Sequence, residues 1–335
     1  MFKHSISYIV DIKIIGKING DFYLAPKMSR KLVFLRHGIR GIVLPGAPET
    51  LTNDPTLLPF FAASQDLTLY GNYYAYRLGQ LLAHYGTPDL IYPDVSDTRN
   101  VDTAVAIAKG IKAKTISFVS ASSDPFFNVP SNTTSETIAI SQKLLKQFTP
   151  SINKIKRKSE KLLPKLTLLD TTTLDNEGNL SGLLPQLYVL SELALFAQLS
   201  AVKFKLTREL NCISKAYNYV QQLEYPVPSV SATSAQTLLA GISYFLVQNK
   251  FSILVGHEYN INAIAQSLGK IYQVGDYVPR YVQATSGFIF TLKAKYLKIE
   301  YLWLSLDGNY YTAKYLKIPI PAPAFTQTLT PFRVG

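Results

Sequence analysis

The strongest chemical signal in the chain is the sequence Arg-His-Gly-Ile-Arg, which begins at Arg36 directly after the apolar run Leu32–Leu35. The apolar run predicts a buried strand, and parallel strands present functional side chains at their carboxyl ends. The guanidinium groups of Arg36 and Arg40 could hold a phosphate dianion through paired hydrogen bonds, and the imidazole of His37 could attack its phosphorus atom. Gly38 would let the backbone turn tightly and approach a ligand. A solvated basic loop after a core strand is the alternative interpretation.

A second apolar run, Phe251–Val255, ends in a similar way, with Gly256, His257 and Glu258. It predicts another buried strand with polar groups at its carboxyl end, so the two strand ends could form the two halves of one site. Alternatively, the pair of polar residues could cap a helix that begins near Asn260.

A third arginine, Arg99, follows Asp97 and Thr98 at the junction between a predicted strand and a predicted helix. The N-terminus of a helix is already positive, so an arginine there makes electrostatic sense when an anion binds in front of it. Arg99 is therefore a candidate third phosphate ligand. The alternative is an exposed arginine in a loop.

The sequence offers no credible set of metal ligands. Ile261 stands where a zinc-protease motif starting at His257 would need its second histidine. The chain has only four histidines and one cysteine, Cys212, which argues against a zinc cluster. It also lacks a glycine-rich Lys-Ser/Thr phosphate loop and a Gly-x-Ser-x-Gly elbow. We therefore expect neither a metal nor another cofactor.

Composition indicates a folded protein with a positive charge. The 335 residues are 47% hydrophobic and 17% charged, which fits one large domain or a domain with a sizeable insertion. The net charge is +12, and the densest basic run, Lys154–Lys158, is typical of a solvated helix face. No nucleic-acid-binding motif accompanies it. We expect a phosphorylated small molecule as the partner and no nucleic acid, and the sequence does not indicate an oligomeric state.

The chain contains no apolar run long enough for a transmembrane segment. Residues 1–27 make a poor secretory signal. Met28 could be the natural start, or the alternating residues Ile6–Ile12 could form an edge strand. The single cysteine fits a reducing compartment. We therefore expect a cytoplasmic location, with export as the alternative.

Hydrophobic periodicity predicts an α/β pattern that is interrupted by a helical stretch from about residue 131 to 228. In the helix that Thr68 should cap, large apolar residues from Leu69 to Leu82 are assigned to the inner face. The predicted helices are 68–85, 98–109, 135–148, 187–204, 206–223, 235–247 and 260–268. The predicted strands are 32–35, 90–92, 116–119, 251–255, 288–293, 298–304 and 310–314.

Five landmarks in this order resemble the histidine acid phosphatases, the second branch of the histidine phosphatase superfamily, which includes bacterial phytases and glucose-1-phosphatases. The Arg-His-Gly-Ile-Arg sequence matches the RHGxR signature of that family. The remaining landmarks are Thr98-Arg99, Ser123–Phe127, Gly256–Glu258 and Ser286–Phe288. They span residues 31 to 295, and the ordered set is far more specific than one RHG triplet.

The resemblance implies a role for each candidate residue. His37 would be the nucleophile that becomes phosphohistidine, and Glu258 would stand where the family has an aspartate that protonates the leaving oxygen. The phosphoryl oxygens would be held by Arg36, Arg40, Arg99 and His257. No metal would be needed, because arginines and imidazoles stabilise the charge.

The resemblance also implies the architecture: a phosphoglycerate-mutase-like three-layer α/β/α core with a mostly helical inserted cap. The core would comprise residues 28–130 and 229–335, the cap residues 131–228, and an N-terminal extension residues 1–27. The implied activity is phosphomonoester hydrolysis. A phosphate mutase, a phosphatase specific for sugar or inositol phosphates, and a phosphoryl-binding pseudoenzyme weakened by glutamate in place of aspartate remain alternatives. The disulfides usual in the family are absent.

Overall fold

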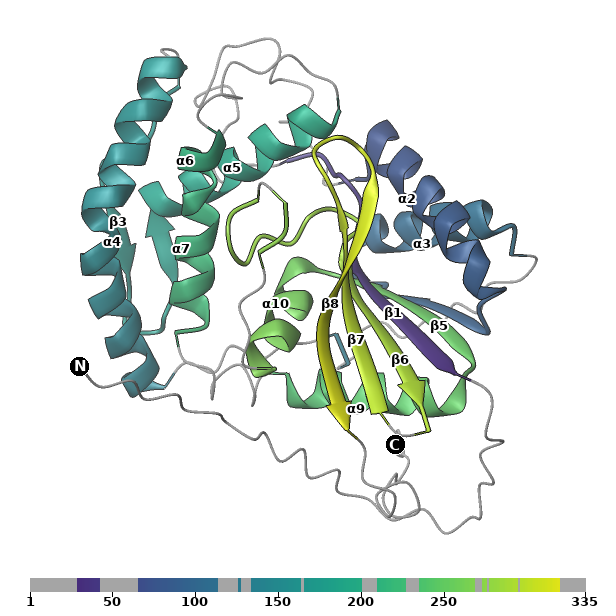
Figure 1. Cartoon of the computed structure of the whole chain (residues 1–335). Helices are drawn as coiled ribbons and strands as arrows, with labels where there is room; N and C mark the ends of the chain where they lie inside the picture. Colours follow the sequence, from purple (N-terminus) through teal and green to yellow (C-terminus); the bar gives the residue numbers. More distant parts are fainter. Residues whose placement is uncertain are drawn as a thin grey trace.

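The computed structural model describes residues 29–42, 66–113, 126–127, 134–163, 166–200, 210–226, 235–268, 273–275, 277–294 and 296–319. Its centre is a six-stranded sheet with the order β2-β5-β1-β6-β7-β8 (Figure 1). The first three strands in that order are parallel, and the last three add an antiparallel meander. The strands are β1 (Arg30–Arg36), β2 (Leu90–Pro93), β5 (Phe251–Gly256), β6 (Gly287–Lys293), β7 (Tyr296–Leu304) and β8 (Tyr310–Pro319).

The register of the parallel strands brings their carboxyl ends to one edge of the sheet. Arg36 at the end of β1 lies opposite Gly256 at the end of β5, and Pro93 at the end of β2 lies opposite Val255. The residues that follow these strands are therefore neighbours, as expected for the ligand-binding edge of a parallel sheet.

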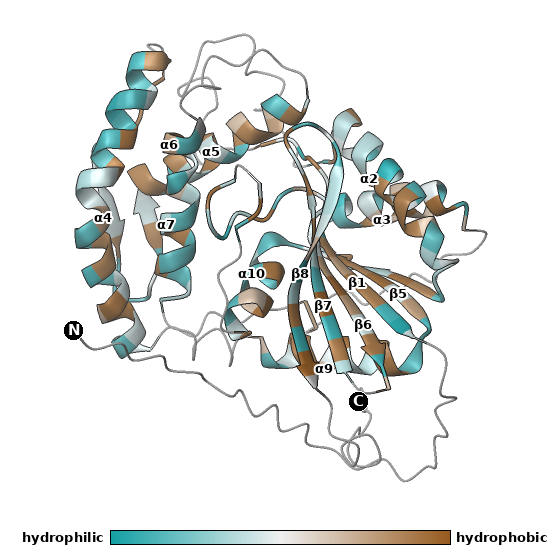
Figure 2. Ribbon diagram, viewed as in Figure 1, coloured by the Kyte–Doolittle hydropathy of each residue, from teal (hydrophilic) through white to brown (hydrophobic). Residues whose placement is uncertain are grey.

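Helices cover both faces of the sheet. Side chains alternate along a strand, so Val33 and Leu35 point to one face and Leu32 and Phe34 to the other. The first pair packs with α2 (Leu69–Leu82) and α3 (Thr98–Ile111), and the second pair packs with α9 (Gln236–Gln248) and α10 (Glu258–Ser267). Figure 2 shows the central strands largely in the hydrophobic colour. The predicted three-layer core is confirmed.

The face of α2 that packs inward agrees with the prediction only in part, because Leu78 and Leu82 are buried as expected but the other large residues assigned to that face are exposed. The helix buries Tyr74, Leu78 and two glycines, whereas the side chain of Leu69 is 88% exposed. The glycines explain the difference: a Cβ on Gly79 would overlap the carbonyl oxygen of Ile107 in α3. The two helices thus touch backbone to backbone, and the small residues, rather than the largest apolar ones, mark the contact.

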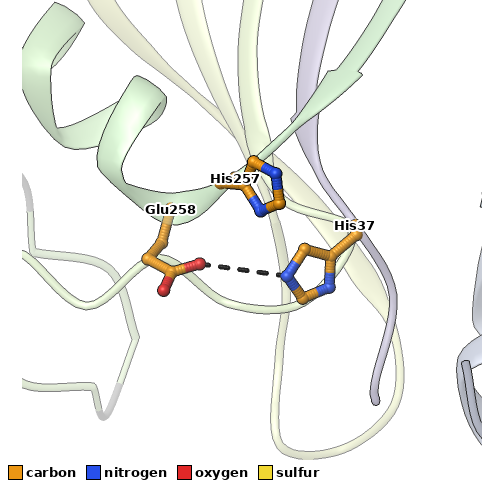
Figure 3. A group of neighbouring side chains, drawn as sticks. All are labelled: His37, His257 and Glu258. Carbon is orange, nitrogen blue, oxygen red and sulfur yellow. Dashed lines mark ion pairs between the residues drawn. The ribbon is translucent and has the colours of Figure 1, made fainter. Parts of the chain in front are cut away.

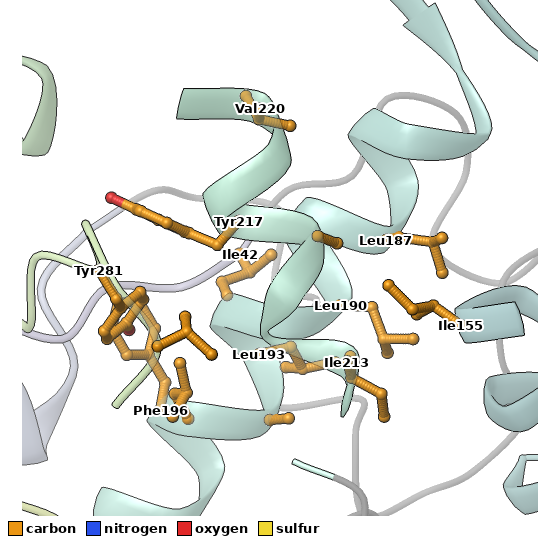
Figure 4. Packing of buried hydrophobic residues seen from close by; sticks show 14 of the residues in the cluster. Ile42, Ile155, Leu187, Leu190, Leu193, Phe196, Ile213, Tyr217, Val220 and Tyr281 are labelled. Atoms are coloured by element: carbon orange, nitrogen blue, oxygen red, sulfur yellow. The ribbon is translucent and has the colours of Figure 1, made fainter. Parts of the chain in front are cut away.

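A helical segment lies beside the core. The apolar cluster inside it, which Figure 4 shows from close by, also includes core residues such as Ile42 and Tyr281, so it packs the segment onto the core. The segment comprises α4 (Ser135–Leu162), α5 (Leu183–Leu199), α6 (Leu210–Ile213), α7 (Lys215–Glu224) and a hairpin of β3 (Thr172–Leu174) and β4 (Leu180–Gly182). The sequence did not predict the hairpin. It also ended the first helix at residue 148, whereas α4 continues through Pro150.

Some predictions fall on residues outside the described ranges, namely the strand 116–119 and the whole N-terminal extension 1–27. The predicted helix 206–223 is divided, because α6 and α7 are separated at Ser214. Among the described helices, none is long and apolar enough to cross a membrane. The residue limits of core and cap remain predictions.

Candidate active site

His37 lies at the carboxyl end of β1 and is only 1% exposed. Its backbone is fixed on both sides, because its N–H donates to the carbonyl of Gly256 at 2.9 Å and its carbonyl accepts from Thr285 at 3.0 Å. Its ring Nδ1 lies 2.8 Å from the carbonyl oxygen of Gly38. A carbonyl can only accept, so Nδ1 carries the proton and Nε2 of the neutral ring keeps its lone pair.

The Nε2 atom of His37 is buried and has no hydrogen-bond partner among the described residues. Burial lowers the pKa of His37 well below 6.5, and the nearby charges of Arg36, His257, Arg40 and Arg99 lower it further. The ring therefore stays neutral in acidic solution, and it offers an unprotonated nitrogen where a protonated histidine would be useless as a nucleophile.

The loop after His37 is held between two helices. The N–H of Gly38 donates to the hydroxyl of Thr103 in α3 at 2.9 Å. On the opposite side, a Cβ on Gly38 would lie 3.0 Å from the carbonyl oxygen of Gly71, and a Cβ on Gly71 would overlap the carbonyl oxygen of Ile39. The glycine after the histidine is thus required by close approach to α2.

Arg36 is fully buried and its guanidinium is surrounded by acceptors. Nη1 donates to the carbonyl of Val282 at 2.6 Å, Nη2 donates to Glu192, and Nε lies 3.2 Å from Oε2 of Glu258. The other carboxylate oxygen of Glu192 accepts from Nη2 of Arg40 at 3.2 Å. One buried carboxylate from α5 therefore joins the two arginines of the motif and fixes their spacing.

Arg99 lies in the first turn of α3, and its guanidinium makes a two-pronged pair with Asp97. Nη1 lies 2.9 Å from Oδ1 and Nη2 lies 2.7 Å from Oδ2. The same Nη2 lies 3.5 Å from Nδ1 of His257. The pair holds the guanidinium flat beside the second histidine, which is a favourable geometry for a phosphate oxygen.

His257 both caps α10 and lies in the site, so the helix cap and the site residue that the sequence offered as alternatives are compatible with each other. Its N–H donates to Oδ1 of Asn260 at 2.8 Å, while its ring lies 5.6 Å from that of His37. Its Nε2 lies 3.2 Å from Oδ2 of Asp94, which directly follows β2. Burial raises the pKa of Asp94, but hydrogen bonds from His257 and Ser96 lower it by more, so the carboxylate stays ionised and orients the ring.

Glu258, the first residue of α10, is 17% exposed and faces His37 (Figure 3). Its Oε2 lies 3.9 Å from Nε2 of His37, and its Oε1 accepts from the hydroxyl of Tyr188 at 3.2 Å. Burial would raise the pKa of Glu258, but the charges of Arg36 and Arg40 outweigh burial and lower the pKa to about 2. The carboxylate is therefore ionised when no anion occupies the site.

All six residues that the sequence singled out lie around one point, together with residues that it missed. Asp94 could have been found, because it follows a predicted strand as His37 and His257 do. Glu192 had a subtler signal: it is the one charged residue of α5, an otherwise apolar helix. Nothing local indicated Tyr188, which reaches Glu258 only through the packing of the helical segment on the core.

The donor atoms of His37, His257 and Glu258 lie within 4.8 Å of one another, a separation that could suit a metal ion. The surrounding charges make the site better suited to an anion. Arg36 already contacts Glu258, and Arg99 lies beside His257. A cation would face two guanidinium groups at close range, whereas a phosphate would neutralise them.

No protein-family model matches the sequence, and no curated protein matches it. The structure nevertheless matches a solved phytase from Hafnia alvei in its apo form, with a TM-score of 0.69, 15% identity, and coverage of 90% of this chain and 97% of that one. This chain has the phytase fold. A phytase from Citrobacter braakii matches with a TM-score of 0.69, 16% identity, and coverage of 86% and 91% of the two chains. A phytase from Klebsiella sp. ASR1 matches with a TM-score of 0.68, 15% identity, and coverage of 86% of this chain and 88% of that one.

Proposed function

We propose that this protein hydrolyses phosphomonoesters through a covalent phosphohistidine on His37. The observation that supports this most directly is the buried, unprotonated Nε2 of His37, which has no hydrogen-bond partner in the part of the chain that the structure describes. It lies among Arg36, Arg40 and Arg99, whose charges all act on the ring. An unpartnered nitrogen in so positive an environment suits attack on an anionic phosphorus centre.

In the first step, Nε2 of His37 attacks phosphorus and the bond from phosphorus to the alcohol oxygen breaks. The arginines and His257 hold the three remaining phosphoryl oxygens, where negative charge must be stabilised in the transition state. Because Glu192 ties Arg36 to Arg40, these two groups are already in place before the substrate binds. They need little reorganisation at the moment of reaction.

Glu258 would handle the proton. A bound phosphate neutralises the guanidinium charges that lower the pKa of this carboxyl group, so binding raises that pKa. A phosphomonoester monoanion also brings a proton of its own to the site. Glu258 can then protonate the departing alkoxide, become ionised, and accept a proton from the water that attacks phosphohistidine. The phosphate takes this proton with it when it leaves as the monoanion, so Glu258 returns to the ionised state of the free site.

The low pKa of Glu258 keeps one alternative open, a phosphoryl-binding protein that turns over slowly. Such a protein would bind phosphate mimics, but it would not hydrolyse esters whose alcohol must be protonated in order to leave. The substrate itself is a phosphorylated small molecule in either case. A phosphatase specific for inositol phosphates is the other alternative, since the similar structures are phytases by name.

The test is a rapid-quench experiment on the full chain with a ³²P-labelled aryl phosphate at pH 4 to 7. We expect an acid-labile, base-stable label on His37 that forms and decays at the rate of turnover. Turnover without a label on His37 would contradict the covalent mechanism. A stable label that does not decay would favour the phosphoryl-binding alternative.

A further inference from the structure

A pocket of about 240 Å³ adjoins the site at Glu258. Oε2 of this residue faces Arg36 and His37, and Oε1 accepts from Tyr188, which also lines the pocket. The residue that would protonate the leaving oxygen thus stands between the phosphate site and the pocket. The alcohol part of a substrate attached to that oxygen would enter this pocket.

One wall of the pocket is apolar and rigid. Leu180, Pro185 and Val220 come from β4, α5 and α7, so three separate elements of the helical segment form it. Tyr188 and Tyr259 add two aromatic rings to the lining, and Tyr188 is itself stacked on Tyr217 with 4.9 Å between ring centroids. Such a wall fits an apolar or aromatic body, whose burial stabilises the complex.

The polar part of the lining is acidic. Glu224 lines the pocket and accepts a hydrogen bond from Gln221 at 3.3 Å. It is also the last residue of α7, so the negative end of that helix dipole lies at the same place. Among the described residues that line the pocket, there is no lysine or arginine. Burial and the charge of Glu258 raise the pKa of Glu224 to about 7. Above that pH, a second phosphate on the alcohol would meet a carboxylate and a helix C-terminus, without a lysine or arginine among the described lining residues to balance it.

We propose that this pocket selects phosphomonoesters of apolar or aromatic alcohols that carry no second phosphate. The proposal rests on the proposed function, because it assigns the alcohol half of the same reaction. A dianionic phosphate beside Glu224 is repelled at short range, and with partial exposure to solvent the penalty on binding amounts to about tenfold or more. Polyphosphorylated alcohols are therefore poor substrates, although the phosphate site itself accepts them.

The experiment compares phenyl phosphate with 1,4-phenylene bisphosphate, which has the same ring and one additional phosphate. The full chain is assayed above pH 7, where Glu224 is ionised, with both compounds, with 4-hydroxyphenyl phosphate as a neutral control for size, and with inositol hexakisphosphate. We expect kcat/KM to be at least about tenfold higher for phenyl phosphate than for the bisphosphate. 4-Hydroxyphenyl phosphate should behave like phenyl phosphate, and inositol hexakisphosphate should be the poorest substrate.

Two substitutions locate the source of the preference. Glu224→Gln should reduce the ratio of the two kcat/KM values to a few-fold, and Glu224→Lys should abolish or invert the ratio, mainly through a lower KM for the bisphosphate. Glu160→Lys is the matched control, because this residue of α4 does not line the pocket and the net charge changes equally. The ratio should stay unchanged in the control.

The outcomes separate the two proposals. Hydrolysis of phenyl phosphate with an equal or greater preference for the bisphosphate or inositol hexakisphosphate overturns the pocket assignment and leaves the phosphatase function intact. A preference that responds equally to Glu224→Lys and Glu160→Lys also overturns it, because general charge then explains the effect. Absence of any phosphatase activity overturns both proposals.

Discussion

The two ends of the site are built differently. The phosphate end consists of charged groups held at strand ends and buried, with each described guanidinium paired to a carboxylate: Glu192 with Arg36 and Arg40, and Asp97 with Arg99. The alcohol end consists of apolar and aromatic side chains from β4, α5, α7 and α10, with one partly solvated acid. The charges of the first end determine the reaction, whereas the second end can change without disturbing them.

Glu192 complicates this division, because it belongs to the helical segment and serves the phosphate end. Its helix, α5, also supplies Tyr188 and Pro185 to the alcohol end. The helical segment is therefore more than a cover that adjusts specificity. Among the described residues, Glu192 is the carboxylate that pairs with both motif arginines. We therefore expect the packing of this segment and the arrangement of the proposed phosphate ligands to be coupled.

The largest effect should follow from removing the nucleophile. His37→Ala should lower turnover of 4-nitrophenyl phosphate by at least about 10⁴-fold, since no other described side chain offers an unprotonated nitrogen at that point. The fold should persist, as measured by circular dichroism and thermal unfolding. His84→Ala, at an exposed histidine, is the control and should retain activity. Near-normal turnover by His37→Ala would show that His37 is not the nucleophile and would contradict the proposed active site.

The arginines should come next. Replacement of Arg40 or Arg99 by Ala should lower kcat/KM about 10²- to 10³-fold, because each loses charge stabilisation in the transition state. Lysine should restore little, since it cannot make the two-pronged contact. Arg77→Ala, in α2 and outside the site, should have little effect. Full rescue by lysine at both positions would argue against phosphate binding by these side chains.

Glu192→Gln tests whether the two ends are coupled. It keeps the shape of the side chain but removes the charge that joins Arg36 and Arg40, so we expect a loss of roughly tenfold or more in kcat. Glu192→Ala should in addition lower the free energy of unfolding by a few kcal/mol, because it leaves Arg36 without its buried partner. Kinetics and urea unfolding measure the two effects. An unchanged kcat in Glu192→Gln would show that the helical segment does not affect the phosphate end and contributes only to substrate specificity.

Glu258→Gln should separate leaving groups. An alkoxide needs a proton to depart and nitrophenolate does not. We therefore expect a loss of about 10²-fold or more on an alkyl phosphate and a much smaller loss on 4-nitrophenyl phosphate. Glu258→Asp should keep activity on both. Equal losses on both substrates in Glu258→Gln would mean that the residue positions Arg36 or His37 and donates no proton.

The smallest effect concerns stability and pH. The folded-state pKa of His37 is lowered, so between its unfolded pKa near 6.5 and its folded value only the unfolded chain binds the proton. As the pH is lowered through that window, the free energy of unfolding should decrease by up to about 1.4 kcal/mol per pH unit. The substitution His37→Gln should reduce the slope of unfolding free energy against pH between 6.5 and 5. An unchanged slope would show that this ring titrates normally.

Local patterns predicted the phosphate end because His37 and His257 directly follow apolar strands and Arg99 lies at the start of a helix that follows another strand. The strand ends of β1 and β5 could be recognised from a few consecutive residues, and the family resemblance supplied their roles. Glu192 and Tyr188 are brought to the site by tertiary packing of α5, which no local pattern reveals. The prediction for the inner face of α2 was right for Leu78 and Leu82 and wrong for the other large residues, for a related reason. Hydrophobic periodicity weighs large side chains, whereas this helix packs through glycines.

The glycine contacts of α2 limit which residues can change as related sequences diverge. Core side chains can be exchanged in compensating pairs, with one growing as another shrinks. No neighbouring exchange makes room where a methyl group would overlap a carbonyl oxygen, as it would at Gly71 against Ile39 and at Gly79 against Ile107. In lineages that diverge from this chain, these two glycines should outlast most of the apolar core. They lie outside the group of residues proposed to bind phosphate, yet they would be among the last recognisable signs of common ancestry.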